Sequence, residues 1–430
     1  MLFQSTNPAY ESLQIPNFRF FALSRLLVVA ALEMMLTVMG WQVYDLTHDP
    51  LALGMIGLAE AVPFILVCLF SGYIIDTYNR HHIGLFCLLL ILLLLGGLFA
   101  VNHWGFGWAQ QRLVLFYYTF IFALGLVRGF LNPAYTSLLP FLVERRLYAN
   151  AVSWNSNAWQ LAAVGGPALG GLLYGFGGAS LAYGTMVVFV FLSLVLFARI
   201  KYISGAQAVR REPILQSLRE GAKFIFSHPI LLGASALDMF AVLFGGAVAL
   251  LPMFAADVLH VGPVGLGFLR AAPFVGAILM GFYLAHYPPL HHSGKKLLLS
   301  VAAFGLCIIA FGLSANVYLS WALLFLGGAF DSINVVIRST ILQLSTPDSM
   351  RGRVSAFNGI FIGVSNEIGA FESGVAARFL GLVPSVVFGG SMTLLVVAAA
   401  YWLVPQFKQL HLGKWIDQQH ANQAGISSNL

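Results

Sequence analysis

The sequence predicts an all-α membrane protein in which twelve transmembrane helices form two pseudo-symmetric halves of six. Three observations support this fold class: a very apolar composition, apolar runs that recur along the whole chain, and an internal repeat. Of the 430 residues, 59% are hydrophobic and only 9% are charged, and the mean hydropathy is +0.85. A soluble domain usually has about 25% charged residues, so this chain has too little polar surface for water to be its only solvent.

Apolar runs of roughly 20 residues recur from one end of the chain to the other, and each is long enough to cross a bilayer as a helix. The segment Met1–Asn17 before the first run is polar, so we expect this run to be a permanent helix rather than a cleaved signal peptide. The predicted helices cover residues 20–44, 50–74, 83–101, 113–139, 150–176, 182–199, 230–255, 262–286, 297–314, 317–343, 353–377 and 382–404.

Basic residues are concentrated in alternate loops. The loops on the side of the N-terminus carry nearly all of them, whereas the opposite loops carry only Arg112 and Arg378. The positive-inside rule therefore predicts a multi-pass protein of a bacterial inner (plasma) membrane with both termini in the cytoplasm. The net charge of +6 follows from this topology, so we expect no nucleic-acid partner.

The longest interruption between apolar runs divides the chain into four predicted parts. One helical stripe of the interruption holds Ile214, Leu218, Ala222 and Ile225, which favours an amphipathic helix on the anionic membrane surface, with a plain linker as the alternative. The parts are a six-helix half over 1–200, a cytoplasmic linker over 201–229, a second six-helix half over 230–404 and a polar cytoplasmic tail over 405–430.

Two stretches of the first half recur in the second. GLAEAVPF at 57–64 aligns without gaps on GFLRAAPF at 267–274, a shift of 210 residues. GGPALGGLLYGFG at 165–177 aligns on GAFESGVAARFLG at 369–381, a shift of 204. Two nearly equal shifts indicate a parallel repeat, in which the halves are related by an axis along the membrane normal.

The loop after the second predicted helix has Gly72, Asp76 and Arg80 at four-residue steps. This spacing resembles the cytoplasmic motif of the major facilitator superfamily, and the resemblance extends over nearly the whole chain. Asp76 can then face the N-terminal end of helix eleven, near Arg351 and Arg353, and close the cytoplasmic side. Ordinary capping of a helix end is the alternative.

The fifth predicted helix contains Gly166, Pro167, Gly170 and Gly171 in a GPxxGG arrangement. It is similar to the glycine-proline motif of exporters in this superfamily, and the glycines allow close helix packing. Further phrases, such as Asn132-Pro-Ala, resemble the transmembrane-effector branch, which includes the enterobactin exporter and macrolide efflux pumps. This resemblance implies export of a small organic molecule.

Several charged residues lie within the predicted spans. Each costs roughly 2.5–3.5 kcal/mol in the bilayer, so each needs a partner or a water-filled cavity. The candidate substrate and proton residues are Glu33, Glu60, Arg128, Arg270, Asp331 and Glu367 near mid-depth, with Asp238 and Arg338 nearer the cytoplasm. Structural ion pairs away from the substrate are the alternative.

The repeat relates some of these charges as opposites. At the shift of 210 residues Glu60 corresponds to Arg270, and at a shift of 203 Arg128 corresponds to Asp331. We therefore expect acid and base on facing halves of a central cavity.

The sequence has no GxxxxGK[ST] motif, so we expect an ion gradient rather than ATP to drive transport. Our hypothesis is a proton antiporter that exports a siderophore or a drug by alternating access. A carboxylate such as Glu33, Asp238 or Asp331 would take up a proton on the outside and release it inside. A lysophospholipid facilitator or flippase is the first alternative, and a non-transporting membrane sensor is the second. An enzyme is disfavoured because neither GxSxG nor HExxH occurs.

The remaining predictions concern ligands and partners. Cys68, Cys87 and Cys307 lie in apolar runs without paired spacing, so we expect no disulfide, no metal and no cofactor. The histidine pairs that begin at His81 and His291 fall in predicted cytoplasmic loops and are expected to be solvated. The expected partners are protons, the small-molecule substrate and membrane lipids, and the protein is expected to act as a monomer.

Overall fold

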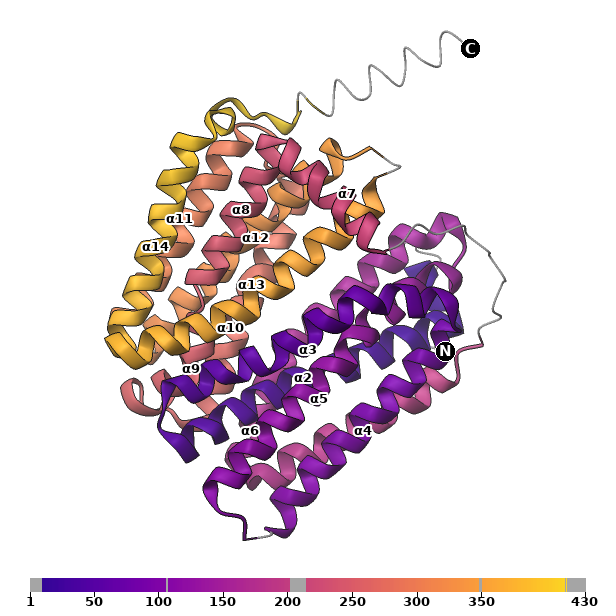
Figure 1. Cartoon of the computed structure of the whole chain (residues 1–430), viewed down its shortest axis with the longest axis vertical. Coiled ribbons are helices and arrows are strands. Elements are labelled where there is room, and N and C mark those ends of the chain that lie inside the picture. The colour runs from indigo at the N-terminus through magenta and orange to yellow at the C-terminus, as the bar shows by residue number, and fades with distance from the viewer. Residues whose placement is uncertain (1–9, 106, 202–213, 348–349, 414, 416–430) are drawn as a thin grey trace. The chain divides into compact units, whose positions relative to one another are not determined.

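The computed structural model describes residues 10–105, 107–201, 214–347, 350–413 and 415, and in these residues every regular element is a helix (Figure 1). Residues 202–213 of the predicted linker, and residues 414 and 416–430 of the predicted tail, lie outside the described residues.

Contacts between residues divide the chain into two compact units. The first comprises Met1–Ile214 with Ala249–Ala271, and the second comprises Leu215–Val248 with Ala272–Leu430. The predicted boundaries of the two halves, the linker and the tail stay a prediction.

Five long helices form most of the first unit. Their starts follow local sequence signals: Pro16 and Pro50 occupy first-turn positions, and the Asp49 and Asn79 side chains accept hydrogen bonds from backbone N–H groups of the helices that follow them. These helices are α2 (Pro16–Thr47), α3 (Pro50–Thr77), α4 (Arg80–Trp104), α5 (Gln110–Leu138) and α6 (Tyr148–Ala198), preceded by the short α1 (Glu11–Gln14).

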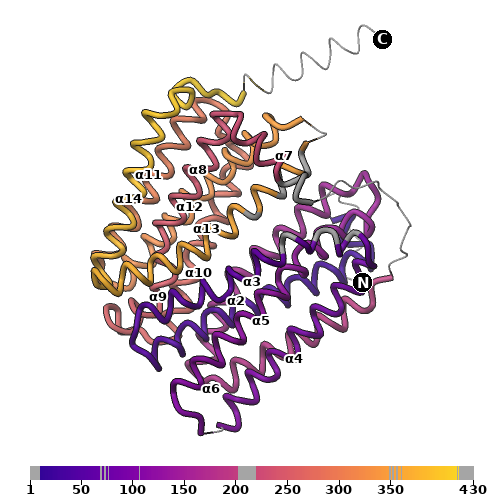
Figure 2. Tube along the Cα trace, in the orientation of Figure 1, coloured from indigo at the N-terminus to yellow at the C-terminus, as the bar shows by residue number. Residues whose placement is uncertain are grey.

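The 51-residue helix α6 contains two of the predicted spans. Gly178 has φ 67° and ψ −167°, which is non-helical and lies in a region that side chains other than glycine rarely adopt. The trace changes course within α6 (Figure 2), so the segment consists of two helices that meet at Gly178. This division agrees with the predicted helices at 150–176 and 182–199.

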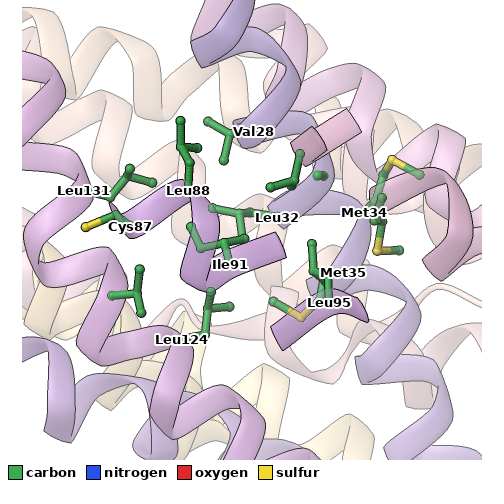
Figure 3. Close-up of a cluster of buried hydrophobic side chains, with 14 of the residues drawn as sticks. Val28, Leu32, Met34, Met35, Cys87, Leu88, Ile91, Leu95, Leu124 and Leu131 are labelled. Atoms are coloured by element: carbon green, nitrogen blue, oxygen red, sulfur yellow. The ribbon is translucent and has the colours of Figure 1, made fainter. Parts of the chain in front are cut away.

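The core of the first unit is apolar and closely packed. Helix α2 packs along α6, and α3 packs along α5. Side chains from α2, α4 and α5 meet in one cluster, in which Leu32, Ile91 and Leu124 are buried (Figure 3). This packing fixes the helices that carry the charged residues described below.

The second unit is built from α8 (Pro229–Phe244) and four later long helices, together with the second part of α10 (Gly262–His286). Helix α8 packs against α13 and α14, and α11 packs against α12 and α14. The later helices are α11 (Ser293–Leu313), α12 (Val317–Ser345), α13 (Arg351–Leu380) and α14 (Leu382–Leu403).

The predicted seventh helix, 230–255, is not continuous. Helix α8 ends at Phe244, and the chain continues through η4 (Ala247–Leu250), α9 (Leu251–Met253) and the π-helical turn η5 (Phe254–Val258). Gly245 and Gly246 weaken the helix, and Pro252 lacks a backbone N–H group, which explains the break. The predicted span is therefore present, within the candidate membrane span Pro229–Val258, but its helix is interrupted after Phe244.

Ten of the described helical segments are long and apolar enough to cross a membrane. One of them contains the two helices of α6 that meet at Gly178. Helix α13, with 30 residues, is long enough to cross a membrane but is more polar. Counting α6 as two spans and adding α13 gives the twelve predicted helices.

Two smaller elements modify the predictions. Helix α7 (Ile214–Ser227) forms in the predicted linker, with Ile225 buried and Arg219 and Lys223 exposed.

His81 lies in the first turn of α4, where its ring stacks on Phe197 with the centroids 5.1 Å apart. The prediction of a solvated loop is therefore wrong for His81, because α4 begins earlier than expected.

Candidate functional site

An ion pair joins two helices of the first unit. Arg128 of α5 donates a hydrogen bond from Nη1 to Oε1 of Glu60 of α3. The Glu60 side chain is 4% exposed and that of Arg128 is 25% exposed. Each charge therefore has the partner that it needs inside a membrane-spanning bundle.

A cavity of about 80 Å³ with a mixed polar and apolar lining lies next to Arg128, between α2, α5 and the first part of α6. Its polar and aromatic lining comes from Arg25, Glu33, Arg128, Asn132, Tyr135 and Trp159. Three of these residues carry charge, so the cavity combines cations, an acid and ring surfaces at one place in the first unit.

Glu33 lies on α2 and lines this cavity. Arg128 and Arg270 are the cations that interact electrostatically with its carboxyl group. Arg270 donates a hydrogen bond of 3.1 Å from Nη1 to the backbone oxygen of Leu36, also on α2. Two of the predicted site residues therefore interact with Glu33 within the first unit.

The second unit contains a separate network on α8, α12 and α13. Asn334 donates hydrogen bonds from Nδ2 to Oδ1 of Asp238 at 2.6 Å and to Oδ1 of Asp331 at 3.4 Å. Arg338 lies 3.4 Å from Asp238 through Nη2, and its Nη1 donates to Asn358 at 3.1 Å. The amide of Asn334 thus links two carboxylates, of which Asp238 has the guanidinium partner.

Asp331 differs from Asp238 in this respect. Within the described part of the second unit no cation forms an ion pair with Asp331. Glu367 lies on α13 and is half-buried. The structure therefore brings three of the predicted residues, Asp238, Asp331 and Arg338, into one group.

The glycine-proline motif lies where α6 meets other helices of the first unit. A Cβ atom on Gly166 would lie 2.7 Å from Cβ of Glu33, and one on Gly170 would lie 3.1 Å from Cα of Met34. A Cβ atom on Gly171 would lie 2.5 Å from the backbone oxygen of Pro263. These glycines therefore allow α6 to pack closely on α2 and on the start of α10.

The predicted cytoplasmic gate is described only in part, because the surroundings of Gly72 and the side chains of Asp76 and Arg351 lie outside the described set. Arg80 donates a 3.2 Å hydrogen bond from Nη1 to the backbone oxygen of Ser137. Arg353 forms an ion pair with Glu220 of α7. The contact of Asp76 with the start of helix eleven stays a prediction.

The charge relationships predicted from the repeat are also untested. Glu60, which corresponds to Arg270, pairs with Arg128 in the first unit, whereas Asp331 belongs to the network of the second unit. Sequence reasoning missed Arg25 and Asn334. The available signal for Arg25 was its place within an apolar run, nine residues after Pro16 and eight before Glu33.

The fold and the buried charges define a membrane transporter with the major facilitator fold. Two solved structures share this fold. The POT family transporter PepTSo has a TM-score of 0.71 at 14% identity, covering 92% of this chain and 99% of that chain. The nucleoside transporter NupG has a TM-score of 0.67 at 12% identity, covering 90% and 100%.

The sequence profile of the transmembrane secretion effector family matches residues 9–425, and the chain belongs to this family of the major facilitator superfamily. It is 26% identical over 347 residues to the enterobactin exporter EntS of Shigella dysenteriae serotype 1, covering 79% of this chain and 80% of that protein. The values are the same for EntS of Escherichia coli O1:K1. The chain is thus a multi-pass protein of the bacterial inner membrane.

Proposed function

We propose that the protein is a proton-coupled exporter of a small amphipathic organic molecule, such as a siderophore. Relatives named as enterobactin exporters support the direction and the class of substrate. The glycine-proline motif of α6 supports export as well, because it is similar to the motif of exporters in the superfamily.

The observation that carries proton coupling is the position of Asn334 between Asp238 and Asp331. Two carboxylates in a membrane-spanning bundle share one amide donor, and the nearby guanidinium of Arg338 pairs with Asp238. If both acids were ionised, Asp331 would lie near a second negative charge and would form no ion pair of its own with a described cation, because Arg338 pairs with Asp238, which is costly in a medium of low dielectric constant. A proton on Asp331 removes this cost, so we assign the proton to Asp331 rather than Asp238.

In this proposal the two six-helix halves exchange between inward-open and outward-open states around a site near mid-depth. The proton enters from the outside, is carried by Asp331 and leaves on the inside, in exchange for the substrate. The further elements of the proposal are that both termini are cytoplasmic and that one chain is sufficient for transport.

Transport by proteoliposomes tests the proposal. Purified protein is reconstituted, a pH gradient is imposed, and concentrative movement of radiolabelled enterobactin is measured with and without a protonophore. We expect transport to require the gradient and to need no nucleotide. Concentrative transport that continues after the gradient has collapsed would reject proton coupling.

Variants make the test specific to the proton site. Asp331→Asn should abolish gradient-driven transport while leaving exchange of enterobactin across the membrane at equal pH, because the neutral amide resembles the protonated acid. Glu144→Gln is the matched control, since it neutralises an acid whose side chain is 70% exposed outside the network. Equal loss of gradient-driven transport in both variants would reject the role of Asp331.

The same proteoliposomes separate the alternatives. Movement of a fluorescent lysophospholipid between leaflets, in the absence of any enterobactin transport, would favour the lipid facilitator. A protein that binds enterobactin and moves neither compound would behave as a sensor.

A further inference from the structure

We propose that Arg25 is an anion-binding residue, and that the cavity of the first unit takes an aromatic ring that carries a negatively charged oxygen. The inference rests on the proposed function only in assuming that the ligand of this cavity is a transported molecule. It names the chemical class of that molecule and a residue that binds it.

Arg25 has an unused hydrogen-bond donor on a guanidinium that forms no ion pair with a described residue, whereas Arg338, whose Nε is also buried without a described acceptor, pairs with Asp238. The Nη1 atom of Arg25 is buried, and no described residue accepts a hydrogen bond from it. Its guanidinium group lies over the ring of Tyr135, with Cζ 5.8 Å from the centroid. A ring face at this distance attracts the cation weakly and provides no oxygen acceptor.

Three other arginines inside the described spans have oxygen partners. Arg128 donates to Glu60, Arg270 donates to the backbone of Leu36, and Arg338 pairs with Asp238. A buried cation without such a partner destabilises a membrane-spanning helix bundle. A ligand oxygen that accepts a hydrogen bond from Arg25 would compensate for this, which explains why the residue is retained.

The distribution of charge around the cavity favours an anion. Glu60 neutralises Arg128, and the carboxyl group of Glu33 interacts with Arg128 and Arg270. Arg25 is thus the charge of the cavity lining that is least compensated by the protein. A carboxylate, phenolate or sulfonate placed there would neutralise the positive charge of Arg25, whereas a cationic ligand would be repelled.

The walls of the cavity supply ring surfaces. Tyr135 is held in place because its hydroxyl group lies 2.8 Å from Oγ of Ser24, which in turn lies 2.8 Å from Oγ of Ser193. Trp159 is 39% exposed and also lines the cavity. Drug-sized ligands occupy pockets of about 300–1,000 Å³, so a cavity of about 80 Å³ holds one ring or substituent of a larger molecule.

Binding of three benzene derivatives to the purified full-length protein tests the proposal. Salicylate is anionic, benzyl alcohol is neutral and benzylamine is cationic, and each is titrated in detergent by saturation-transfer NMR. We expect salicylate to bind at least about tenfold more tightly than the other two, the effect of one charge-assisted hydrogen bond. Equal affinities for the three compounds would overturn the proposal.

Three variants assign the preference to the cavity. Arg25→Gln should reduce the affinity for salicylate to that for benzyl alcohol, whereas Arg112→Gln, which removes an exposed arginine at the start of α5, should change nothing. Trp159→Leu should weaken all three compounds alike and leave the preference for the anion. A preference for salicylate that survives in Arg25→Gln would overturn the assignment.

Folding of each variant is checked by its thermal unfolding in detergent. If Arg25→Gln does not fold, Arg25→Lys replaces it and should retain a weaker preference for the anion, because the point charge remains. An unchanged affinity for salicylate in the lysine variant would count against hydrogen bonding by the guanidinium. Gradient-driven transport that persists without any preference for salicylate would reject this inference and leave the proposed function standing.

Discussion

Asn334 donates a 2.6 Å hydrogen bond to the carboxylate of Asp238, and this contact joins α12 to α8 in the second unit. Both residues are buried, so the hydrogen bond is made away from water. The same amide group reaches Asp331 at 3.4 Å. One side chain that the charge pattern of the sequence did not identify therefore donates to both carboxylates.

The first prediction concerns Asn334. Replacement by Ala removes a hydrogen bond to a buried charged group and should reduce the free energy of unfolding by about 1.5–3 kcal/mol. The measurement is thermal or denaturant unfolding in detergent. Asn366→Ala is the matched control, because the Asn366 side chain is exposed and donates only within its own helix, to Ile362. Equal effects of the two changes would show that Asn334 has no special role.

The second prediction concerns the pair of Glu60 and Arg128. Arg128→Ala should destabilise the protein by about 2–3 kcal/mol, less than a fully buried pair because the Arg128 side chain is 25% exposed. Exchanging the two residues, Glu60→Arg with Arg128→Glu, should recover most of this loss. The exposed Arg146, which pairs with Glu144 and Glu11, provides the control, and Arg146→Ala should destabilise the protein far less than Arg128→Ala does.

This exchange can be compared with the one suggested by the repeat. If Arg128 and Asp331 interact across a central cavity, the exchange Arg128→Asp with Asp331→Arg should restore stability instead. If the exchange with Asp331 restored stability and the exchange with Glu60 did not, the pair of Glu60 with Arg128 would not be the main interaction of Arg128.

The third prediction concerns the packing of α6 on α2. Gly166→Ala would place a Cβ atom 2.7 Å from Cβ of Glu33 and 2.9 Å from the backbone oxygen of Ala30. Such overpacking should cost about 1–3 kcal/mol and reduce transport. Gly165→Ala is the control, because a Cβ atom on the neighbouring Gly165 meets nothing within 4 Å. A neutral Gly166→Ala would exclude close packing as the role of this glycine.

The fourth prediction concerns the cost of the Arg25 guanidinium, whose buried Nη1 has no described acceptor. Arg25→Met keeps much of the side-chain length and removes the charge, so the apparent midpoint of thermal unfolding in detergent should rise while binding of salicylate is lost. A gain in stability with a loss of binding is the expected result for a residue retained for its ligand. A fall in the unfolding midpoint would instead indicate that Arg25 is structural.

The sequence by itself determined the class of the protein. The transfer of an apolar run of about 20 residues into a bilayer depends on the composition of that run, so span positions can be predicted locally. The break in α6 could be predicted in the same way, because the apolar runs on either side of Gly178 were already separate. The motif of Gly166 and Gly170 identified a close helix contact, since only small residues permit it.

Only the tertiary structure decided which charges pair. Glu60 and Arg128 lie 68 positions apart, and their contact depends on how α3 and α5 are rotated and packed against each other. The same holds for Arg25, whose unused donor becomes visible only when every neighbouring acceptor has been located. A buried charge can be recognised from the sequence by its cost, but its partner is set by the packing of helices that are distant in the chain.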